Sequence, residues 1–214
     1  MPNPKPAPGT RSARKRQAIL DAALEVFLEY GFVGAGMDQV AVAASVSKVT
    51  VYSHFTDKQR LFVAVIERAI NEAEAGSRAL VEELTSSGDL ARDLSRFARR
   101  HIALVTQPHL VRMRRLIVAE SGRFPDLARA WHAAGPEKGH ATLAAQIRRL
   151  AERGLLRAPD PLLAAQHLNY LILSVPLNEA LFTGRDAAFP ARRLNRWADE
   201  AVRVFLAAYG APAA

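Results

Sequence analysis

The sequence predicts an all-α fold. Apolar residues recur at spacings of three and four along most of the 214 residues, as in helices with one buried face. Pro108, Pro125, Pro136, Pro161 and Pro190 each lie at or near the start of such a segment, where a missing amide costs nothing. No convincing strand pattern or internal repeat is present. We expect helices over residues 14–29, two short helices within 37–58, and helices over 56–75 or beyond, 89–106, 108–121, 125–134, 137–153, 161–182 and 190–209, with a break at 85–88.

Composition narrows the class of protein. Half of the residues are hydrophobic, 23% are charged, and there is no cysteine, which excludes disulfides and thiolate metal sites. The first ten residues are rich in proline and lack the apolar segment of a signal peptide. The most apolar run, residues 162–177, is interrupted by polar residues and is too short to span a bilayer. We expect a cytoplasmic protein without a membrane partner.

The charge makes an anionic partner plausible. The net charge is +8 and the isoelectric point is near 10.4. The segment before Asp21 contains no acidic residue, and it includes the basic residues Arg11, Arg14, Lys15 and Arg16. Such a run is either a solvated tail or an arm that follows DNA phosphates or enters the minor groove. We expect a disordered basic arm over residues 1–12.

Residues 13–60 carry the pattern of a helix-turn-helix DNA-binding domain with three helices. Apolar positions keep helical spacing on both sides of Ser45, so each half has one apolar and one polar face. Ser47 can cap the second short helix by accepting from the amides that open it. The outward positions of that helix hold donors and no acid, which suits a groove walled by phosphates: Lys48, Thr50, Tyr52, Ser53 and His54.

The stretch MDQVAVAASVSKVTVYSHFTDK, residues 37–58, resembles the DNA-binding domain of TetR-family transcriptional regulators. The similarity covers roughly residues 13–62, and the ending Tyr-x-His-Phe-x-x-Lys is its most distinctive part. The resemblance implies that Thr50 contacts base edges or phosphates, and that Tyr52, His54 and Lys58 mainly contact the DNA backbone. The full predicted DNA-binding set is Arg11, Arg14, Lys15, Arg16, Ser47, Lys48, Thr50, Tyr52, Ser53, His54 and Lys58.

Two residues depart from the family pattern. Gly36 stands where the family usually has Ser or Thr, which removes a side-chain cap that Asp38 partly replaces through the helix dipole. Ser45 stands where the turn usually has Gly. If that turn needs a positive φ angle, Ser45 adopts it at a cost of roughly 1 kcal/mol relative to Gly.

For residues 61–214 the sequence predicts a helical ligand-binding and dimerisation domain. The last two long helices are apolar on more than one side, so they form either a buried monomer core or a surface for a second subunit. The resemblance favours a two-fold homodimer built from these helices. The predicted interface residues are Leu163, Leu171, Leu181, Leu194, Trp197 and Phe205.

The helices between these parts combine apolar walls with a few polar groups, which describes a ligand pocket and also an ordinary core. Residues 112–184 are loosely similar to the AefR-type regulatory domain, which implies an inducer cavity. We expect Arg112, Arg114 and Arg115 to face solvent, with binding of an acidic ligand as the alternative. The predicted ligand-binding residues are Phe97, His101, Leu104, Met113, Ile117, Trp131, Tyr170, Ser174 and Asn178.

No motif in the sequence indicates catalysis. The six histidines lack metal-ligand spacing, and no P-loop, dinucleotide fingerprint or nucleophile elbow is present, so we expect no enzyme, cofactor or metal. The hypothesis is a repressor that binds palindromic operator double-stranded DNA as a homodimer and is released by a small, hydrophobic effector of unknown identity. The alternatives are an activator or constitutive DNA-binding protein without an inducer, and a helical small-molecule-binding protein or enzyme with a degenerate DNA-binding head.

Overall fold

The computed structural model describes residues 8–82, 84, 88–183 and 188–211. These residues confirm the all-α prediction, and their one β feature is an isolated antiparallel bridge between Leu156 and Gly210. The chain divides into two compact units. Unit 1 comprises Met1–Ala69 and Leu116–Ala128, and unit 2 comprises Ile70–Arg115 and Arg129–Ala214. None of the described helices is long and apolar enough to cross a membrane.

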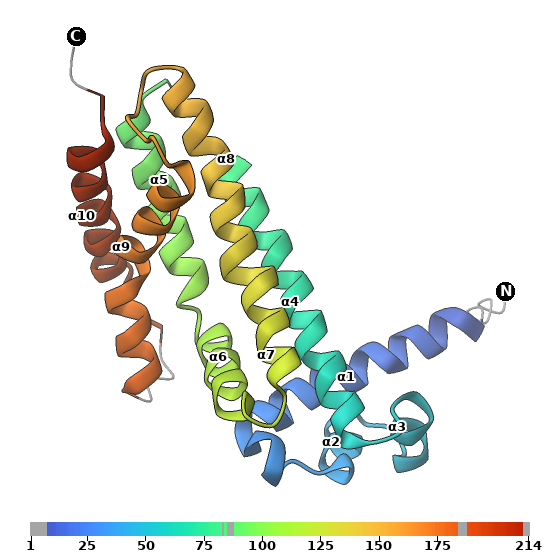
Figure 1. Cartoon of the computed structure of the whole chain (residues 1–214). Coiled ribbons are helices and arrows are strands. Elements are labelled where there is room, and N and C mark those ends of the chain that lie inside the picture. The colour runs from blue at the N-terminus through green and yellow to red at the C-terminus, as the bar shows by residue number, and fades with distance from the viewer. Residues whose placement is uncertain (1–7, 83, 85–87, 184–187, 212–214) are drawn as a thin grey trace, which may run out of the picture. The chain divides into compact units, whose positions relative to one another are not determined.

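Unit 1 contains α1 (Pro8–Gly34), α2 (Met37–Ala43), α3 (Lys48–His54) and the first part of α4 (Lys58–Glu82) (Figure 1). Gly31 interrupts α1 with a φ of 67°, two residues after the predicted end of this helix at residue 29. The prediction of a disordered arm over residues 1–12 is wrong for residues 8–12, because these already belong to α1. Residues 1–7 lie outside the described residues.

An aromatic cluster forms the centre of unit 1. The ring of Phe62 lies 5.0 Å from that of Phe27 and 5.1 Å from that of Phe32, measured between centroids. Phe124, far away in sequence, lies 4.8 Å from Phe32 and 5.2 Å from Phe62. The predicted boundary at residue 60 therefore changes: the compact unit also takes residues 61–69 and 116–128.

Unit 2 holds the rest of α4, with α5 (Leu90–Val105), α8 (Lys138–Glu152), α9 (Pro161–Phe182) and α10 (Ala191–Tyr209). Helix α9 packs on α8 and α10, and α10 packs on α5 (Figure 1). Helices α6 (Pro108–Glu120) and α7 (Pro125–His132) are shared, because residues 116–128 belong to unit 1. The side chains at the centre of unit 2 are fully buried, among them Leu94, Ile102, Leu168 and Phe205.

Local signals explain most helix boundaries of unit 2. The Asp89 carboxylate accepts from the Arg92 amide at 3.0 Å and caps α5, and Asp160 accepts from two amides and caps α9. Pro136 is an exception, because it lies inside a π-helical turn (Ala133–Glu137) that joins α7 to α8, and does not start a helix. The predicted break at residues 85–88 falls mostly outside the described residues.

The turn between α2 and α3 uses a strained residue. Ser45 has a φ of 52°, and it is the one non-glycine residue with positive φ in the described part of the chain. Its side chain is exposed, so no packing inside unit 1 compensates for the left-handed conformation.

We predict that Ser45→Gly raises the free energy of unfolding by about 1 kcal/mol, because glycine adopts this conformation without strain. Urea denaturation of the full chain measures the change. The control is Ala43→Gly, at an exposed helical position of α2, which should lower the free energy of unfolding by about 1 kcal/mol. Loss of stability in both variants would contradict the strain at Ser45.

Candidate nucleic-acid interface and ligand site

Helix α3 is a short, capped helix held by one buried residue. The Ser47 hydroxyl accepts from the Thr50 amide at 3.1 Å, which confirms the predicted N-cap. Val51 is fully buried and fixes the inner face. Lys48, Tyr52 and Ser53 are exposed, and Thr50 and His54 are half-buried. The geometry therefore directs donor side chains outward along one helix.

Asp38 on α2 forms an ion pair with Lys48 on the outward face of α3. The Lys48 ammonium lies 2.8 Å from an Asp38 oxygen, and this hydrogen bond and charge raise the pKa of Lys48. Gly36, which has no side-chain cap, donates its amide to the Gln39 side-chain oxygen at 2.7 Å. Gln39 thus supplies one of the bonds that ordinarily close this end of a helix.

Lys58 points into the protein. Its ammonium donates to the Ala35 carbonyl at 2.8 Å and to the Val33 carbonyl at 3.2 Å, and it lies 4.8 Å from the centroid of the Phe32 ring. The side chain is half-buried. A lysine has three N–H donors, and two are used here on the protein. The predicted contact of Lys58 with the DNA backbone stays a prediction, because these two bonds leave one of its donors unused.

The basic residues of α1 lie on a helix. Arg11, Arg14, Lys15 and Arg16 are exposed in its first turns. The Arg16 guanidinium lies 5.2 Å from the centroid of the Phe55 ring, at the end of α3. This contact brings the predicted basic segment and the predicted DNA-contacting helix to one place.

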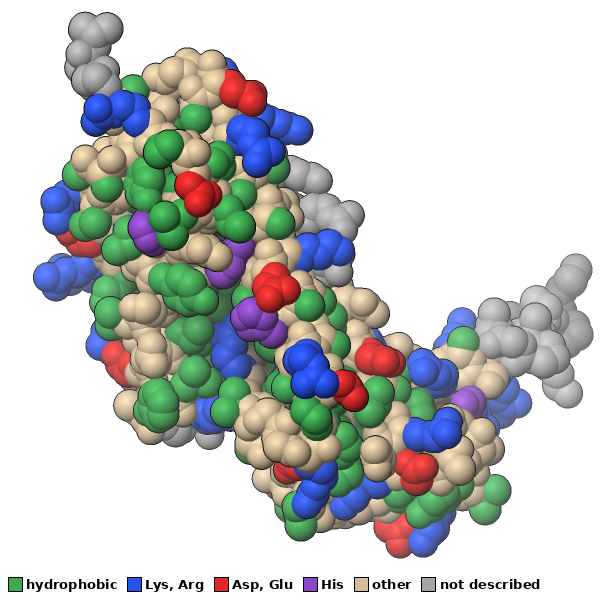
Figure 2. Space-filling view, in the orientation of Figure 1, with side chains coloured by type: hydrophobic (Ala, Val, Ile, Leu, Met, Phe, Trp, Pro, Cys, Tyr) green, Lys and Arg blue, Asp and Glu red, His purple; other side chains and the backbone are tan. Residues whose placement is uncertain are grey.

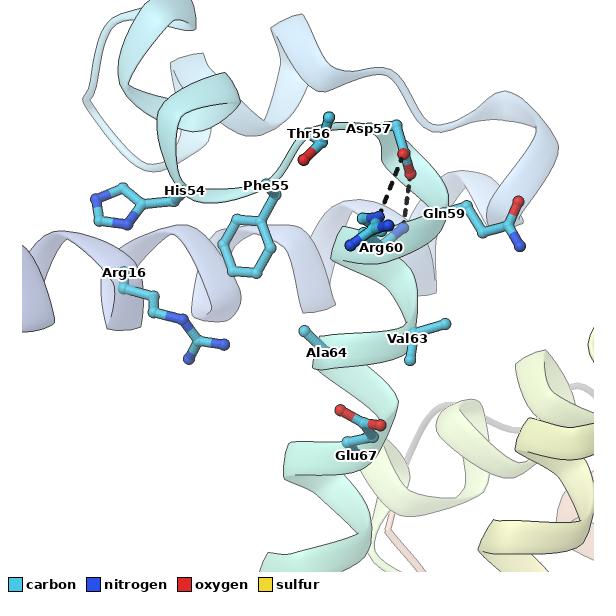
Figure 3. Close-up of a pocket in the computed structure, with 10 residues that line it drawn as sticks. All are labelled: Arg16, His54, Phe55, Thr56, Asp57, Gln59, Arg60, Val63, Ala64 and Glu67. Atoms are coloured by element: carbon cyan, nitrogen blue, oxygen red, sulfur yellow. Dashed lines mark hydrogen bonds and ion pairs between the residues drawn. The ribbon is translucent and has the colours of Figure 1, made fainter.

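An open groove of about 600 Å³ lies where α1, the end of α3 and the start of α4 meet (Figure 3). Arg16 and His54 line it together with the first turns of α4. The Asp57 carboxylate accepts from the Arg60 amide at 2.8 Å, so the protein itself uses one of the free amides at the start of α4. The groove is lined by Arg16 and Arg60 and also by Asp57 and Glu67, so its charge is mixed.

Unit 2 contains a partly buried polar cluster beside its apolar core. His101 on α5 shares a hydrogen bond of 2.9 Å with the Asn169 side-chain oxygen on α9, and the Phe97 ring stacks on it at 5.3 Å. Burial lowers the pKa of His101, and His140 and Arg114 lower it further. His140 on α8 lies against the Tyr170 ring at 5.6 Å, and burial lowers its pKa too. Both histidines are therefore neutral near pH 7.

Comparison with known proteins assigns the chain to a family. Residues 92–211 match the C-terminal domain of AefR-like transcriptional repressors, and residues 19–65 match the bacterial regulatory proteins of the tetR family. The chain belongs to the TetR family. This result confirms the resemblance that residues 37–58 carry.

Solved structures and curated TetR-family relatives agree with this assignment. A crystal structure from Mesorhizobium loti MAFF303099, described as a TetR-family transcriptional regulator, is 39% identical with a TM-score of 0.86, covering 94% of this chain and 98% of that one. The flavonoid-responsive regulator FrrA is 31% identical with a TM-score of 0.68, covering 94% and 100%. The transcriptional activator FasR of Mycolicibacterium smegmatis is 36% identical over 89 residues, which is 39% of this chain and 41% of FasR. The chain spans about a third to a half of the length of the curated relatives that it matches.

The structure brings only some predicted ligand residues together. Phe97 and His101 are in contact, Leu104 packs against the core of unit 2, and Met113 is buried. Ile117 belongs to unit 1, while Ser174 and Asn178 are exposed on α9, so these three do not join the polar cluster. Trp131 is half-buried and Tyr170 is exposed.

Sequence reasoning missed Arg114 and His140 as members of this cluster. The expectation that Arg112, Arg114 and Arg115 face solvent is wrong: all three are half-buried, and Arg115 donates to the Leu181 and Ala180 carbonyls. A signal was present for Arg114, because Leu110, Arg114 and Ile117 share helical spacing and place the cation on an apolar stripe.

The predicted dimer residues also separate into two groups. Leu163 and Leu171 are exposed on α9, and Leu181 and Trp197 are half-buried. Leu194 and Phe205 retain only 6% and 0% of their exposure and belong to the core of their own chain. Since their side chains are covered by their own chain, these two residues do not form a surface for a second subunit, which corrects that part of the prediction.

We predict that Lys58→Met lowers the free energy of unfolding by about 1 to 3 kcal/mol, because two carbonyls lose a charged donor. Thermal and urea unfolding of the full chain measure the loss. The control is Lys48→Met, whose ion pair with Asp38 is exposed and should leave stability nearly unchanged. Equal effects of the two variants would contradict the structural role of Lys58.

Proposed function

We propose that the chain is a transcriptional regulator that represses its target genes, binds palindromic operator DNA as a homodimer, and is released by a small-molecule effector. The observation that carries the proposal is α3, a capped helix anchored by Val51 with its donor side chains directed outward. Such a helix fits the major groove, where hydrogen-bond donors meet base edges and phosphates. Arg14, Lys15 and Arg16 add cations for adjacent phosphates.

An exposed apolar stripe on α9 supports the homodimer. Leu171, Val175 and Phe182 recur at helical spacing and keep 41%, 55% and 84% of their exposure. A contiguous apolar face of this kind is typical of a surface that a partner covers. A two-fold partner places the same stripe against itself and sets two copies of α3 at a fixed separation for two half-sites.

Chain connectivity supports an allosteric link between effector and DNA. Helix α6 carries Arg114 in unit 2 and then enters unit 1, where the following segment places Phe124 in the aromatic cluster. Helix α4 carries Phe62 of the same cluster and continues into unit 2. An effector that shifts α6 or α4 changes how these rings pack, and so changes the placement of the DNA-binding head. To switch the protein fully, the effector must prefer the released form by roughly 5 kcal/mol.

The names of two relatives bear on the chemistry of the effector and on whether the protein represses or activates transcription. FrrA is named for its response to flavonoids, which supports an aromatic effector here, and FasR is named an activator. Activation is therefore the second candidate function. A reporter fused to the target promoter separates the two, since deleting the gene raises expression under repression and lowers it under activation.

We predict that the protein binds a promoter fragment containing an inverted repeat beside its own gene more tightly than a scrambled fragment. Gel shifts at several salt concentrations should give a steep salt dependence, and Arg14→Ala should reduce its slope by roughly 1 for each phosphate that Arg14 neutralises. Arg148→Ala, an exposed change on α8, is the matched control and should leave the slope unchanged. Equal affinity for both fragments would defeat the proposal of a specific regulator.

We predict that the double variant Leu171→Asp, Val175→Asp is monomeric, because a carboxylate on the stripe loses its hydration at the contact. Light scattering after size-exclusion chromatography measures the mass. Val118→Asp changes a similarly exposed valine on α6 and should remain a dimer. A monomeric wild-type chain, or a dimeric double variant, would remove α9 as the interface.

A further inference from the structure

Unit 2 holds a half-buried cation, Arg114, that forms no ion pair with the described residues. The Nη1 atom of Arg114 is buried and has no hydrogen-bond partner among the described residues, and no carboxylate of those residues pairs with this side chain. Burial lowers the pKa of Arg114, and Tyr170 is the one group whose charge opposes that change. Burying an unpaired guanidinium is costly, so this residue is poorly explained by stability alone.

A second orphaned polar atom lies in the same cluster. His140 Nε2 is buried and also has no hydrogen-bond partner among the described residues. In the tautomer with the proton on Nε2, neutral His140 is a donor. His101 is close enough to both Arg114 and His140 for their charges to affect its pKa. His101 also bonds Asn169 on α9 at 2.9 Å, and His140 lies against the next residue of α9, Tyr170, so residues of α5, α8 and α9 meet at this cluster.

The surroundings of these donors are aromatic. The Phe97 and His101 rings stack 5.3 Å apart and nearly parallel, and the His140 and Tyr170 rings lie 5.6 Å apart. Tyr170 keeps 55% of its exposure, so the cluster reaches the surface of unit 2 at α9. Figure 2 shows histidine and arginine side chains among hydrophobic ones on the face that α8 and α9 form.

We propose that this cluster is the effector site, and that the effector is an amphipathic organic acid whose carboxylate binds Arg114 and His140 while its apolar body lies against Phe97 and His101. A carboxylate supplies the two acceptor oxygens that the orphaned donors lack. A cation and a neutral donor together select an anion over a neutral isostere. The inference rests on the proposed ligand response, and it replaces the expected hydrophobic effector by an acid.

The test compares matched acids and amides on the full chain by isothermal titration calorimetry. The probes are 2-naphthoate with 2-naphthamide, and decanoate with decanamide. We expect at least one acid to bind about 10- to 100-fold more tightly than its amide, and Arg114→Met to remove that preference. Arg148→Met, an exposed arginine on α8, should bind like the wild type.

The stability of Arg114→Met without ligand distinguishes a ligand-binding arginine from a structural one. A ligand-binding role predicts an unfolding midpoint equal to or above that of the wild type, because an unpaired buried charge is removed. A fall in the midpoint would assign Arg114 to the fold and overturn the proposal. Failure of both acids to bind at millimolar concentration, or equal binding of acid and amide, would overturn it as well.

DNA binding separates this inference from the proposed function. Gel shifts with the promoter fragment should show Arg114→Met bound as tightly as the wild type, and no longer released by the acid that binds the wild type. If an acid binds through Arg114 but never releases the protein from DNA, the result supports the ligand site and contradicts the proposed release by ligand. Loss of DNA binding in the wild type would defeat the regulator and leave the calorimetry unaffected.

Discussion

The packing of Phe124 against Phe32 and Phe62 is the contact on which the core of unit 1 depends. Each aromatic pair of this kind is worth about 0.5 to 1.5 kcal/mol beyond the area it buries. The three helices of the head supply Phe27 and Phe32 from α1 and none from α2 or α3, so the cluster is completed by α4 and by the segment after α6. The head is therefore not a closed module. Its core includes residues whose positions are set by helices that continue into unit 2.

The sequence predicts most helix boundaries of this fold, but it does not predict the Phe124 contact. Helix boundaries in unit 2 follow from local chemistry, such as the Asp89 and Asp160 caps and the prolines at helix starts, and they lie within a few residues of the prediction. The place of Phe124 does not follow, because periodicity indicates that a residue is buried and not which helix it meets. Pro136 also departs from the prediction: it lies inside the helical turn Ala133–Glu137, none of whose residues is buried, although a proline locally disfavours a helical conformation there.

The residues of the candidate sites also differ in how well the sequence predicts them. The outward face of α3 is predictable, because Ser47 and Val51 fix the cap and the buried side within one short segment. Lys58 and Arg114 are not, because each is a cation whose direction depends on groups far away in sequence. Lys58 turns inward where two carbonyls accept from it. Arg114 has a buried Nη1 atom with no hydrogen-bond partner among the described residues, and burial lowers its pKa.

Two features of the described residues, the positive φ of Ser45 and the unpaired Nη1 atom of Arg114, each cost stability. Such conflicts are expected where function and stability compete. The carboxylate that we propose as the effector would pair with the Arg114 guanidinium and would remove this cost only while it is bound. The ligand-free form thus holds unfavourable free energy inside unit 2, at the helix that continues toward Phe124. If the packing of Phe124 differs between the DNA-bound and released forms, relief of that cost is the differential free energy that a ligand needs to shift one form toward the other.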